Sequence, residues 1–255
     1  MLKVLTYNIH KGFDRRNREF VLHEIRRQIE SIDVDVVFLQ EIQGRHFHHE
    51  KRISGWPAES QFEFLADRLW PHFAYGKNAI YDNGHHGNAI LSKHAFEDWQ
   101  NINFSRFKTA SRSLLHGVVR MPERNARLHL ICTHLELIGF ERKRQIEIIR
   151  RHMNERIEAG ESVILAGDFN DWHGRMGQHF ESQLSLEEAH KTTHGKYAKT
   201  FPANWPILQM DRVYYRQLKL LECECLNMQP WGRLSDHLPL YAQFSFPECN
   251  DAPAF

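Results

Sequence analysis

The fold is decided by residues 163–170, which read Val-Ile-Leu-Ala-Gly-Asp-Phe-Asn. A continuous apolar run of this length is typical of a strand that is covered on both faces. The run ends abruptly in a carboxylate and an amide, Asp168 and Asn170. A buried strand with a polar end delivers that end to the rim of its sheet, where α/β proteins bind ligands. We therefore expect a functional site at the end of this strand.

The same ending recurs at three other places in the chain. Asn8 follows an apolar segment, Glu41 follows the run 36–40, and His134 follows the run 130–133. Each ending alone is also what the start of an ordinary turn would look like. Four such endings, which supply carboxylate, amide and imidazole groups, favour one shared site.

Short apolar runs alternate with two helical patterns, which indicates an α/β protein. One helix is expected around 21–29, and a second around 146–157 that closes at Gly160. Neither a repeat nor a Gly- or Pro-rich linker divides the sequence. We expect a single domain over residues 1–247 and a short C-terminal tail over 248–255. Strands are expected at 2–7, 34–40, 89–92, 114–120, 128–133, 162–166, 211–215 and 238–246.

Composition narrows the class of protein. The 255 residues carry a formal net charge of +1 and are 42% hydrophobic, which excludes a disordered chain. A protein that binds nucleic acid through total charge alone is usually basic, and this chain is not. We find no signal peptide and no integral membrane segment, and the four cysteines suit a reducing compartment. We therefore expect a cytoplasmic monomer.

The segment Ser235-Asp236-His237 precedes another apolar strand and adds a carboxylate beside an imidazole. A capped turn is the alternative explanation of this segment. Glu41 and Asp236 are hard oxygen ligands, and Asn8 offers an amide oxygen. This donor set suits Mg²⁺, with Mn²⁺ as the alternative, and not Zn²⁺. The sequence thus predicts a site for a hard divalent cation.

The remaining groups suit hydrolysis of a phosphate ester by in-line attack of water. Asp168 is a candidate general base, with Asn170 helping to hold the water. His134 and His237 could donate hydrogen bonds to phosphate oxygens. Asp211 begins another strand and could orient an imidazole, or could form a plain ion pair.

These segments together resemble the endonuclease/exonuclease/phosphatase superfamily, which includes DNase I-like and exonuclease III-like enzymes. The matching segments follow the family's order from residue 3 to residue 246. The resemblance implies a four-layer α/β sandwich, in which two packed mixed sheets are flanked by helices. It implies a divalent cation held by Glu41 with Asn8 and Asp236. It also implies that Asp168 activates water beside Asn170, that His134 and His237 contact the phosphate, and that Asp211 supports His237. The matching segments are 6–12, 39–41, 87–92, 133–135, 167–171, 211–213 and 235–239; the phrases at 85–89 and 200–202 resemble a bacterial subgroup without a settled substrate.

Two further residues are candidates for binding substrate. Asn88 precedes a strand and could place its amide at the rim, although a turn asparagine is an equal explanation. Arg112 also precedes a strand and could hold a phosphate oxygen. His10 and Lys11 follow Asn8 and could face the same pocket.

The leading hypothesis is a metal-dependent phosphodiesterase with a nucleic-acid substrate. Alternatives are a phospholipid or inositol-type head group, a small soluble phosphodiester, and a catalytically silent binding protein on the same fold. The 18 histidines would also permit a zinc protein, but none has the usual ligand spacing. Most of the other histidines are expected in loops and on the surface. Early-loop residues that could line a nucleic-acid groove, or simply be solvated, are Arg15, Arg16, Arg18, Arg45, His46, His48 and His49.

Overall fold

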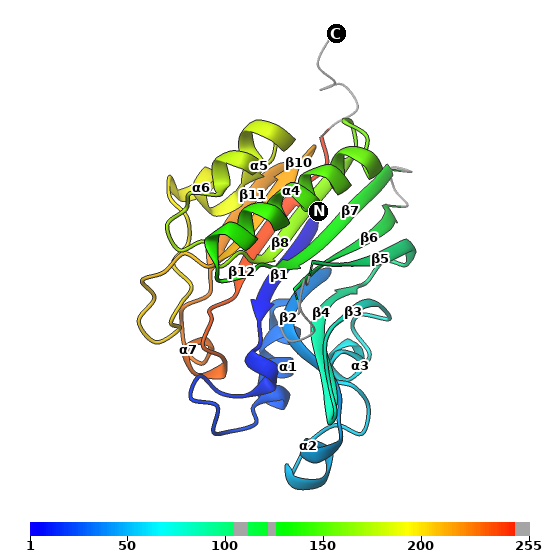
Figure 1. Cartoon of the computed structure of the whole chain (residues 1–255), viewed down its shortest axis with the longest axis vertical. Coiled ribbons are helices and arrows are strands. Elements are labelled where there is room, and N and C mark those ends of the chain that lie inside the picture. Colours follow the sequence, from blue (N-terminus) through cyan, green and yellow to red (C-terminus); the bar gives the residue numbers. More distant parts are fainter. Residues whose placement is uncertain (105–111, 122–125, 248–255) are drawn as a thin grey trace.

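Two mixed six-stranded sheets form the centre of the molecule, which we describe from a computed structural model (Figure 1). The structure describes residues 1–104, 112–121 and 126–247, so the expected tail at 248–255 lies outside the described residues. The strand order is β11-β12-β1-β2-β4-β3 in the first sheet and β5-β6-β7-β8-β10-β9 in the second. Parallel pairs β1/β2 and β7/β8 lie inside the sheets, among antiparallel neighbours.

The chain enters the first sheet, passes through the second, and returns to the first. The strands are β1 Leu2–Asn8, β2 Val36–His46, β3 His72–Tyr81, β4 Gly84–Ser92, β5 Phe96–Asn103, β6 Ser113–Met121, β7 Ala126–His134, β8 Ser162–Asp168, β9 Glu187–Glu188, β10 Asp211–Arg216, β11 Lys219–Cys225 and β12 Leu240–Ser245. The helices are η1 His10–Gly12, α1 Leu22–Ile32, α2 Phe47–Arg52, α3 Gln61–Ala66, α4 Gly139–Arg156, α5 Gly177–Leu184, α6 Ala189–His194 and α7 Trp231–Leu234.

The central strands are apolar on both faces because each face packs against a different layer. In β8, Ile164 and Ala166 face the core between the sheets, whereas Val163 and Leu165 face a helix-covered core. β2 divides in the same way, with Phe38 turned toward the core between the sheets. The two-residue period of a strand therefore explains why these runs show no polar alternation.

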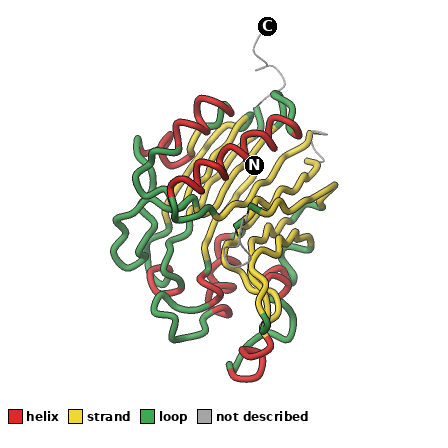
Figure 2. The backbone as a smooth tube through the Cα atoms, in the orientation of Figure 1, coloured by secondary structure: helices red, strands yellow, loops and turns green. Residues whose placement is uncertain are grey.

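Helices cover the two outer faces (Figure 2). α1 and α3 contribute Ile25, Ile29 and Leu65 to the core on the first sheet. α4 and α5 contribute Ile149 and Phe180 to the core on the second sheet. The layers are thus helix, sheet, sheet and helix, which confirms the predicted four-layer α/β sandwich.

Register brings the polar strand ends together. His134 pairs with Asp168 across the parallel β7/β8 pair, and Asp211 pairs with Asp168 across the antiparallel β8/β10 pair. Asn8 closes β1 at the same end of the first sheet. The adjacent strands β7, β8 and β10 of the second sheet thus present their functional groups at one edge.

The sequence suggested that Glu41 follows its strand. In the structure, Glu41 instead lies inside β2. The pairing of β2 with β4 shifts between Leu39 and Ile42, so Gln40 and Glu41 both lie opposite Asn88. This arrangement is a β-bulge, which lets the strand continue while it re-aims a side chain. β2 therefore extends to His46, six residues beyond the predicted end at residue 40.

Several other boundaries also differ from expectation; β4 begins at Gly84 and not at 89, and the second helix begins at Gly139, ahead of 146. The second helix ends at Arg156 and not at Gly160, because Ile157 adopts extended backbone and is buried in the core. The last strand begins at Leu240 and ends at Ser245, within the predicted range 238–246. The second helix therefore ends earlier than expected, and the last strand is shorter than expected at both ends.

Four histidines depart from the expectation that most lie in loops or on the surface: His116, His129, His152 and His190 are buried. His116 on β6 contacts His152 on α4 (Nδ1–Nε2 2.8 Å) and His129 on β7 (Nε2–Nδ1 2.9 Å). His129 in turn contacts Glu161 (Nε2–Oε2 3.1 Å).

Within the described ranges, no helix has the length and apolar character needed to cross a membrane.

Candidate active site

Asp168 lies at the centre of the site, at the end of β8. Its side chain is buried, and its Oδ1 accepts the backbone N–H of Asn170 at 3.0 Å. Its Oδ2 accepts the Asn8 amide (Nδ2–Oδ2 3.2 Å) and lies 3.3 Å from His134 Nε2 and 3.7 Å from His237 Nε2. Strand ends from both sheets therefore converge on one carboxylate.

Asn170 holds its own backbone in place beside that carboxylate. It adopts a left-handed conformation (φ 51°), which asparagine tolerates better than most residues. Its amide Nδ2 donates to the carbonyl of Leu135 at 2.8 Å, directly after His134. The turn after β8 is thus fixed to the end of β7.

Arg112 determines which nitrogen of His134 carries a proton. Arg112 Nη1 lies 3.0 Å from His134 Nδ1, and a guanidinium can only donate a hydrogen bond. Burial, together with the positive charge of Arg112, holds the pKa of His134 well below its usual value. His134 is therefore a neutral imidazole whose Nε2–H points toward Asp168.

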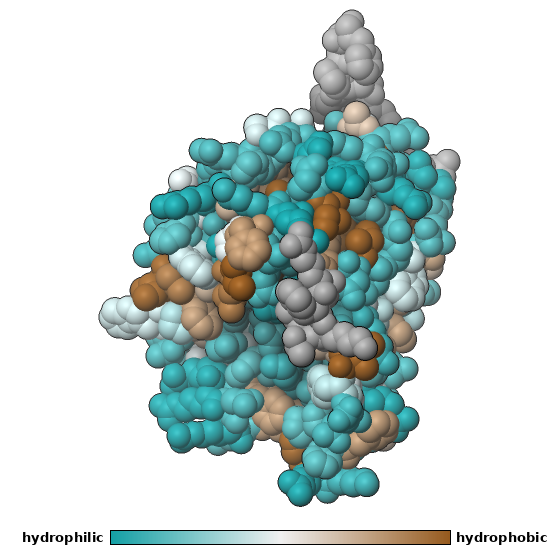
Figure 3. Space-filling model, in the orientation of Figure 1, coloured by the Kyte–Doolittle hydropathy of each residue, from teal (hydrophilic) through white to brown (hydrophobic). Residues whose placement is uncertain are grey.

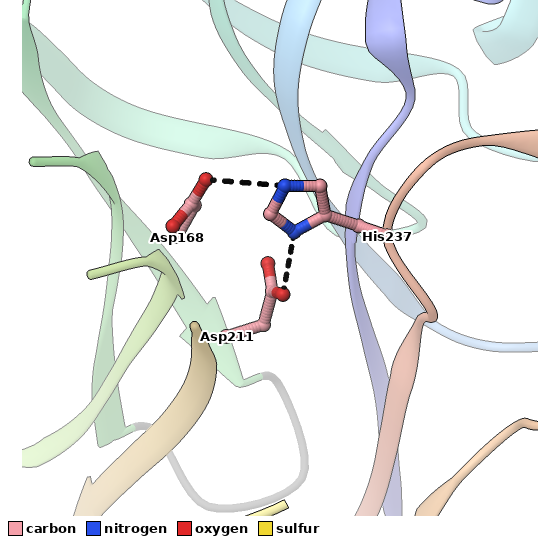
Figure 4. A group of neighbouring side chains, drawn as sticks. All are labelled: Asp168, Asp211 and His237. Atoms are coloured by element: carbon pink, nitrogen blue, oxygen red, sulfur yellow. Dashed lines mark hydrogen bonds and ion pairs between the residues drawn. The ribbon is translucent and has the colours of Figure 1, made fainter. Parts of the chain in front are cut away.

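His237 has the opposite character (Figure 4). Its Nδ1 donates to Asp211 Oδ2 at 2.8 Å, and its Nε2 faces Asp168. Burial alone would lower its pKa, but the Asp211 and Asp168 carboxylates outweigh burial and raise the pKa to about 10. His237 is therefore a cation that can donate from both nitrogens.

Asp211 is itself fixed by Thr200. The Thr200 hydroxyl donates to Asp211 Oδ2 at 2.5 Å and accepts the Asp211 backbone N–H at 3.2 Å. Phe201 adds a ring contact to His237, with 5.0 Å between ring centroids. The sequence left two roles open for Asp211, orienting an imidazole or forming a plain ion pair. Its contact with His237 matches the first role.

Glu41 lies at the bulge of β2 with left-handed backbone (φ 55°). Its Oε2 is 3.1 Å from Lys11 Nζ. Although burial opposes ionisation, the positive charges of Lys11 and Arg112 hold the pKa of Glu41 well below its usual value. Glu41 is therefore a carboxylate that stays negative beside positive groups.

Asn8 and Asp236 are joined through Ser235 and His10. The Ser235 hydroxyl contacts both the Asn8 carbonyl (2.7 Å) and Asp236 Oδ1 (3.3 Å). His10 donates its backbone N–H to Asn8 Oδ1 at 3.1 Å, and its Nδ1 lies 3.9 Å from Asp236 Oδ1. Two carboxylates and an amide oxygen form the donor set that Mg²⁺ or Mn²⁺ prefers, so these residues fit such an ion.

Another group of potential ligands lies deeper in the site. Single ligand atoms of Asp168, Asp211 and His237 all lie within 4.8 Å of one another. The Nδ1–H of His237 is already donated to Asp211, so hydrogen bonding accounts for this grouping. We therefore keep Glu41, Asn8 and Asp236 as the candidate cation ligands.

Asn88 is buried on β4, across the bulge from Glu41. Its Nδ2 is directed to the Ser113 carbonyl at 3.3 Å, next to Arg112 in the sequence. Its Oδ1 accepts no hydrogen bond within the described residues. Asn88 thus leaves one buried polar atom for a ligand.

The sequence did not single out every residue of this site. Thr200 lies in a phrase noted only for its resemblance to a subgroup, and its hydrogen bond to Asp211 depends on long-range register. Glu136 lies 3.8 Å from Arg112 (Oε2–Nε) and stands two residues after the end of the His134 strand. A polar residue two positions after a functional histidine is the one signal that could have identified Glu136.

The fold and the site define a protein of the phosphoesterase type. The chain belongs to the Endonuclease/Exonuclease/phosphatase family, whose sequence pattern it matches over residues 5–237. It is 40% identical over 241 residues to Uncharacterized protein YbhP of Escherichia coli K12, and the match covers 94% of this chain and 95% of that protein.

Solved structures share the fold at low identity. An endonuclease/exonuclease/phosphatase from Beutenbergia cavernae is 19% identical with a TM-score of 0.76, over 96% of this chain and 71% of that chain. The mannosyl-6-phosphatase Bt3783 of Bacteroides thetaiotaomicron is 19% identical with a TM-score of 0.72, over 96% of this chain and 100% of that chain. These similarities establish the architecture.

Proposed function

We propose that this protein is a phosphodiesterase that requires Mg²⁺ or Mn²⁺, hydrolyses its substrate by in-line attack of water, and acts on nucleic acid. The observation that carries the proposal is the contact of Asp168 with two differently protonated imidazoles. One buried carboxylate beside a neutral donor and a cationic donor is suited to moving a proton next to a charged phosphate.

Asp168 is the proposed acceptor of the proton from the attacking water. Burial, reinforced by Asp211, raises the pKa of Asp168, which makes it a stronger base than an exposed carboxylate. The Asn170 backbone and the Asn8 amide fix the carboxylate in one orientation. Both amides orient the base without competing for the proton.

His134 and His237 are the proposed donors to phosphate oxygens. His134 donates from Nε2 because Arg112 occupies Nδ1. His237 donates as a cation because Asp211 compensates its charge. Arg112 contacts His134, and Asn88 bonds to Ser113 next to Arg112, and we propose that both bind the substrate.

The proposed cation ligands are Glu41, Asn8 and Asp236. When bound, a divalent cation would withdraw charge from the phosphate oxygens. Lys11 already supplies one positive charge next to Glu41.

A lipid or inositol-type head group is the second candidate substrate. The segment after His134 exposes Leu137, Ile138 and Phe140 by 50%, 52% and 67%, and Trp205 near Phe201 is 73% exposed. Exposed apolar side chains also stand out on the face shown in Figure 3. Such side chains could insert into a lipid surface.

A substrate panel with and without metal tests the proposal. We expect hydrolysis of DNA or RNA with Mg²⁺ or Mn²⁺, loss of activity in EDTA, and a rate at least about 100-fold lower for Glu41→Ala. Exposed Glu59→Ala serves as the control. Equal rates for wild type and Glu41→Ala, or full activity in EDTA, would contradict it. Hydrolysis of phosphoinositide or sphingomyelin alone would favour the lipid candidate, and no hydrolysis across the panel would favour a silent binding protein.

A further inference from the structure

A groove lined by arginines lies next to the proposed active site. It has a volume of about 650 Å³. One wall is the loop between η1 and α1, and the other is α7 with the residue before it. Figure 1 shows this loop and α7 side by side at the lower left, and the same region of Figure 3 is hydrophilic. The lining residues are Asp14, Arg15, Arg16, Arg18, Glu19, Val21, Glu24, Pro230, Arg233 and Leu234.

Direct contacts join the groove to the site. The backbone N–H of Arg15 lies 3.4 Å from the carbonyl of Arg233. His10, whose backbone holds Asn8, also contacts the Asp14 carbonyl through Nδ1 at 3.2 Å. Arg233 precedes Asp236 by three residues, which span at most about 11 Å. A ligand phosphate in the groove would therefore lie within a few phosphates of the reacting one, since a strand carries one charge per roughly 3.4 Å of helix axis.

Hydrogen bonds close the loop that carries the exposed Arg16 and Arg18. The Asp14 carboxylate accepts the backbone N–H groups of Arg18 and Glu19 at 2.6 and 3.0 Å, which closes the loop on itself. Asp14 N–H donates to the Glu19 carbonyl at 2.8 Å across the base of the loop. Residues 15–17 therefore lie in a turn that the hydrogen bonds of Asp14 close.

The lining of the groove contains more arginines than carboxylates, four against three. Within the described part of the chain, Arg15, Arg16, Arg18 and Arg233 form no ion pair with a carboxylate within 4.0 Å. Two of the three carboxylates have other partners: Asp14 accepts backbone N–H groups of its own loop, and Glu24 pairs with Arg27 while it also interacts electrostatically with Arg233. Arg45, by contrast, pairs with Glu50 (3.6 Å) and does not line this groove.

We propose that this groove binds the phosphates of a nucleic-acid strand that flank the one being hydrolysed. The proposal rests on the proposed phosphodiesterase function and makes its substrate a polyanion. Guanidinium groups bind phosphate oxygens in bidentate fashion, and four of them along one groove match a repeating phosphate backbone. The near-neutral total charge of the chain is compatible with this because the proposal needs only the four arginines that line one groove.

Binding of a fluorescent single-stranded DNA 12-mer, in EDTA and at several salt concentrations, tests the groove. For the double variant Arg16→Ala/Arg18→Ala we expect a Kd at least tenfold higher at low salt. The slope of log Kd against log salt should fall by about 0.7 per arginine removed. Arg151→Ala, which changes an exposed arginine on α4, should bind as wild type does. All variants are compared by circular dichroism to confirm their folding.

If the double variant and wild type have equal Kd values and equal slopes of log Kd against log salt, the proposed role of the groove is wrong. Wild type that binds vesicles containing anionic phospholipid but no oligonucleotide would also overturn it. Hydrolysis of bis(p-nitrophenyl) phosphate, which carries one phosphate, separates the two proposals. If bis(p-nitrophenyl) phosphate is hydrolysed but DNA binding does not depend on the arginines, only the proposal for the groove fails. Arginine-dependent DNA binding without hydrolysis of any phosphoester supports the groove and removes the phosphodiesterase function.

Discussion

Single residues of this site adopt backbone conformations that their side chains disfavour. His10, Lys11, Glu41 and Asn170 all have left-handed backbone, with φ of 46°, 59°, 55° and 51°. Such conformations cost roughly 1–3 kcal/mol each and persist where the surrounding structure enforces them. Their concentration around Asp168 is consistent with positioning for function, and the sequence gives no direct sign of it.

The sequence could propose most of the candidate site residues, but it could not indicate their protonation. Asp168 and His134 could be chosen because each follows an apolar run, and Asp211 because it begins a strand. The contact of Arg112 with His134 Nδ1 joins residues 22 apart in the sequence and depends on the pairing of β6 with β7. Only that contact shows which nitrogen of His134 donates.

Arg112→Gln tests the assignment of this tautomer. Without the guanidinium, Nδ1 loses a cationic donor, and we expect His134 to populate its other tautomer. Activity should fall roughly 10- to 100-fold, as it does when groups that orient an active-site histidine are removed. The ¹⁵N chemical shifts of His134 report the tautomer directly. An unchanged Nε2–H tautomer together with wild-type activity would be inconsistent with this role for Arg112.

At the scale of elements, the missed strands share one property. β3, β5, β9 and β11 were not predicted, and these four form the edges of the two sheets. Edge strands carry polar residues and lack the continuous apolar run of a central strand. β5 reads Phe-Glu-Asp-Trp-Gln-Asn-Ile-Asn and has no fully buried residue. The central strands were found because both of their faces are buried, a property that composition reveals.

The buried histidines between β6, β7 and α4 give stability a defined pH dependence. Burial, together with His129, His152 and Arg156, lowers the pKa of His116 to about 3. Other charged groups that act on the cluster are Glu155, Glu161, Arg127 and Arg216, of which Arg127 and Glu161 pair with each other at 2.6 Å. Because the folded pKa lies below the unfolded value, the unfolded state binds more protons between these two values. Stability is therefore full near pH 7 and falls as the pH drops below about 6.5.

His116→Gln removes this titration but can keep hydrogen bonds to both neighbours. Between pH 6 and pH 4, the slope of unfolding free energy against pH should decrease by roughly 1 kcal/mol per pH unit relative to wild type. Urea denaturation at several pH values measures the slope. His48→Gln, an exposed substitution on α2, is the matched control. Parallel pH profiles for wild type and His116→Gln would refute this role for the cluster.

At the scale of the whole molecule, the site exists because two sheets end at the same place. Asn8 and Glu41 come from the first sheet, whereas His134, Asp168 and Asp211 come from the second. We propose that residues 1–247 form one domain, because Leu2 and Phe244 pack in the same core between the sheets. Sequence motifs could name the strand ends, but only the packing of the sheets places them around one carboxylate.

The most direct test of the proposed chemistry is the turnover number of Asp168→Asn on a DNA oligonucleotide with Mg²⁺. Asparagine keeps the shape of the side chain but cannot accept the proton, so kcat should fall roughly 10²- to 10⁴-fold while KM stays near that of wild type. Exposed Asp98→Asn on β5 should keep the wild-type kcat. A kcat of Asp168→Asn equal to that of wild type would show that Asp168 is not the base of a phosphodiesterase.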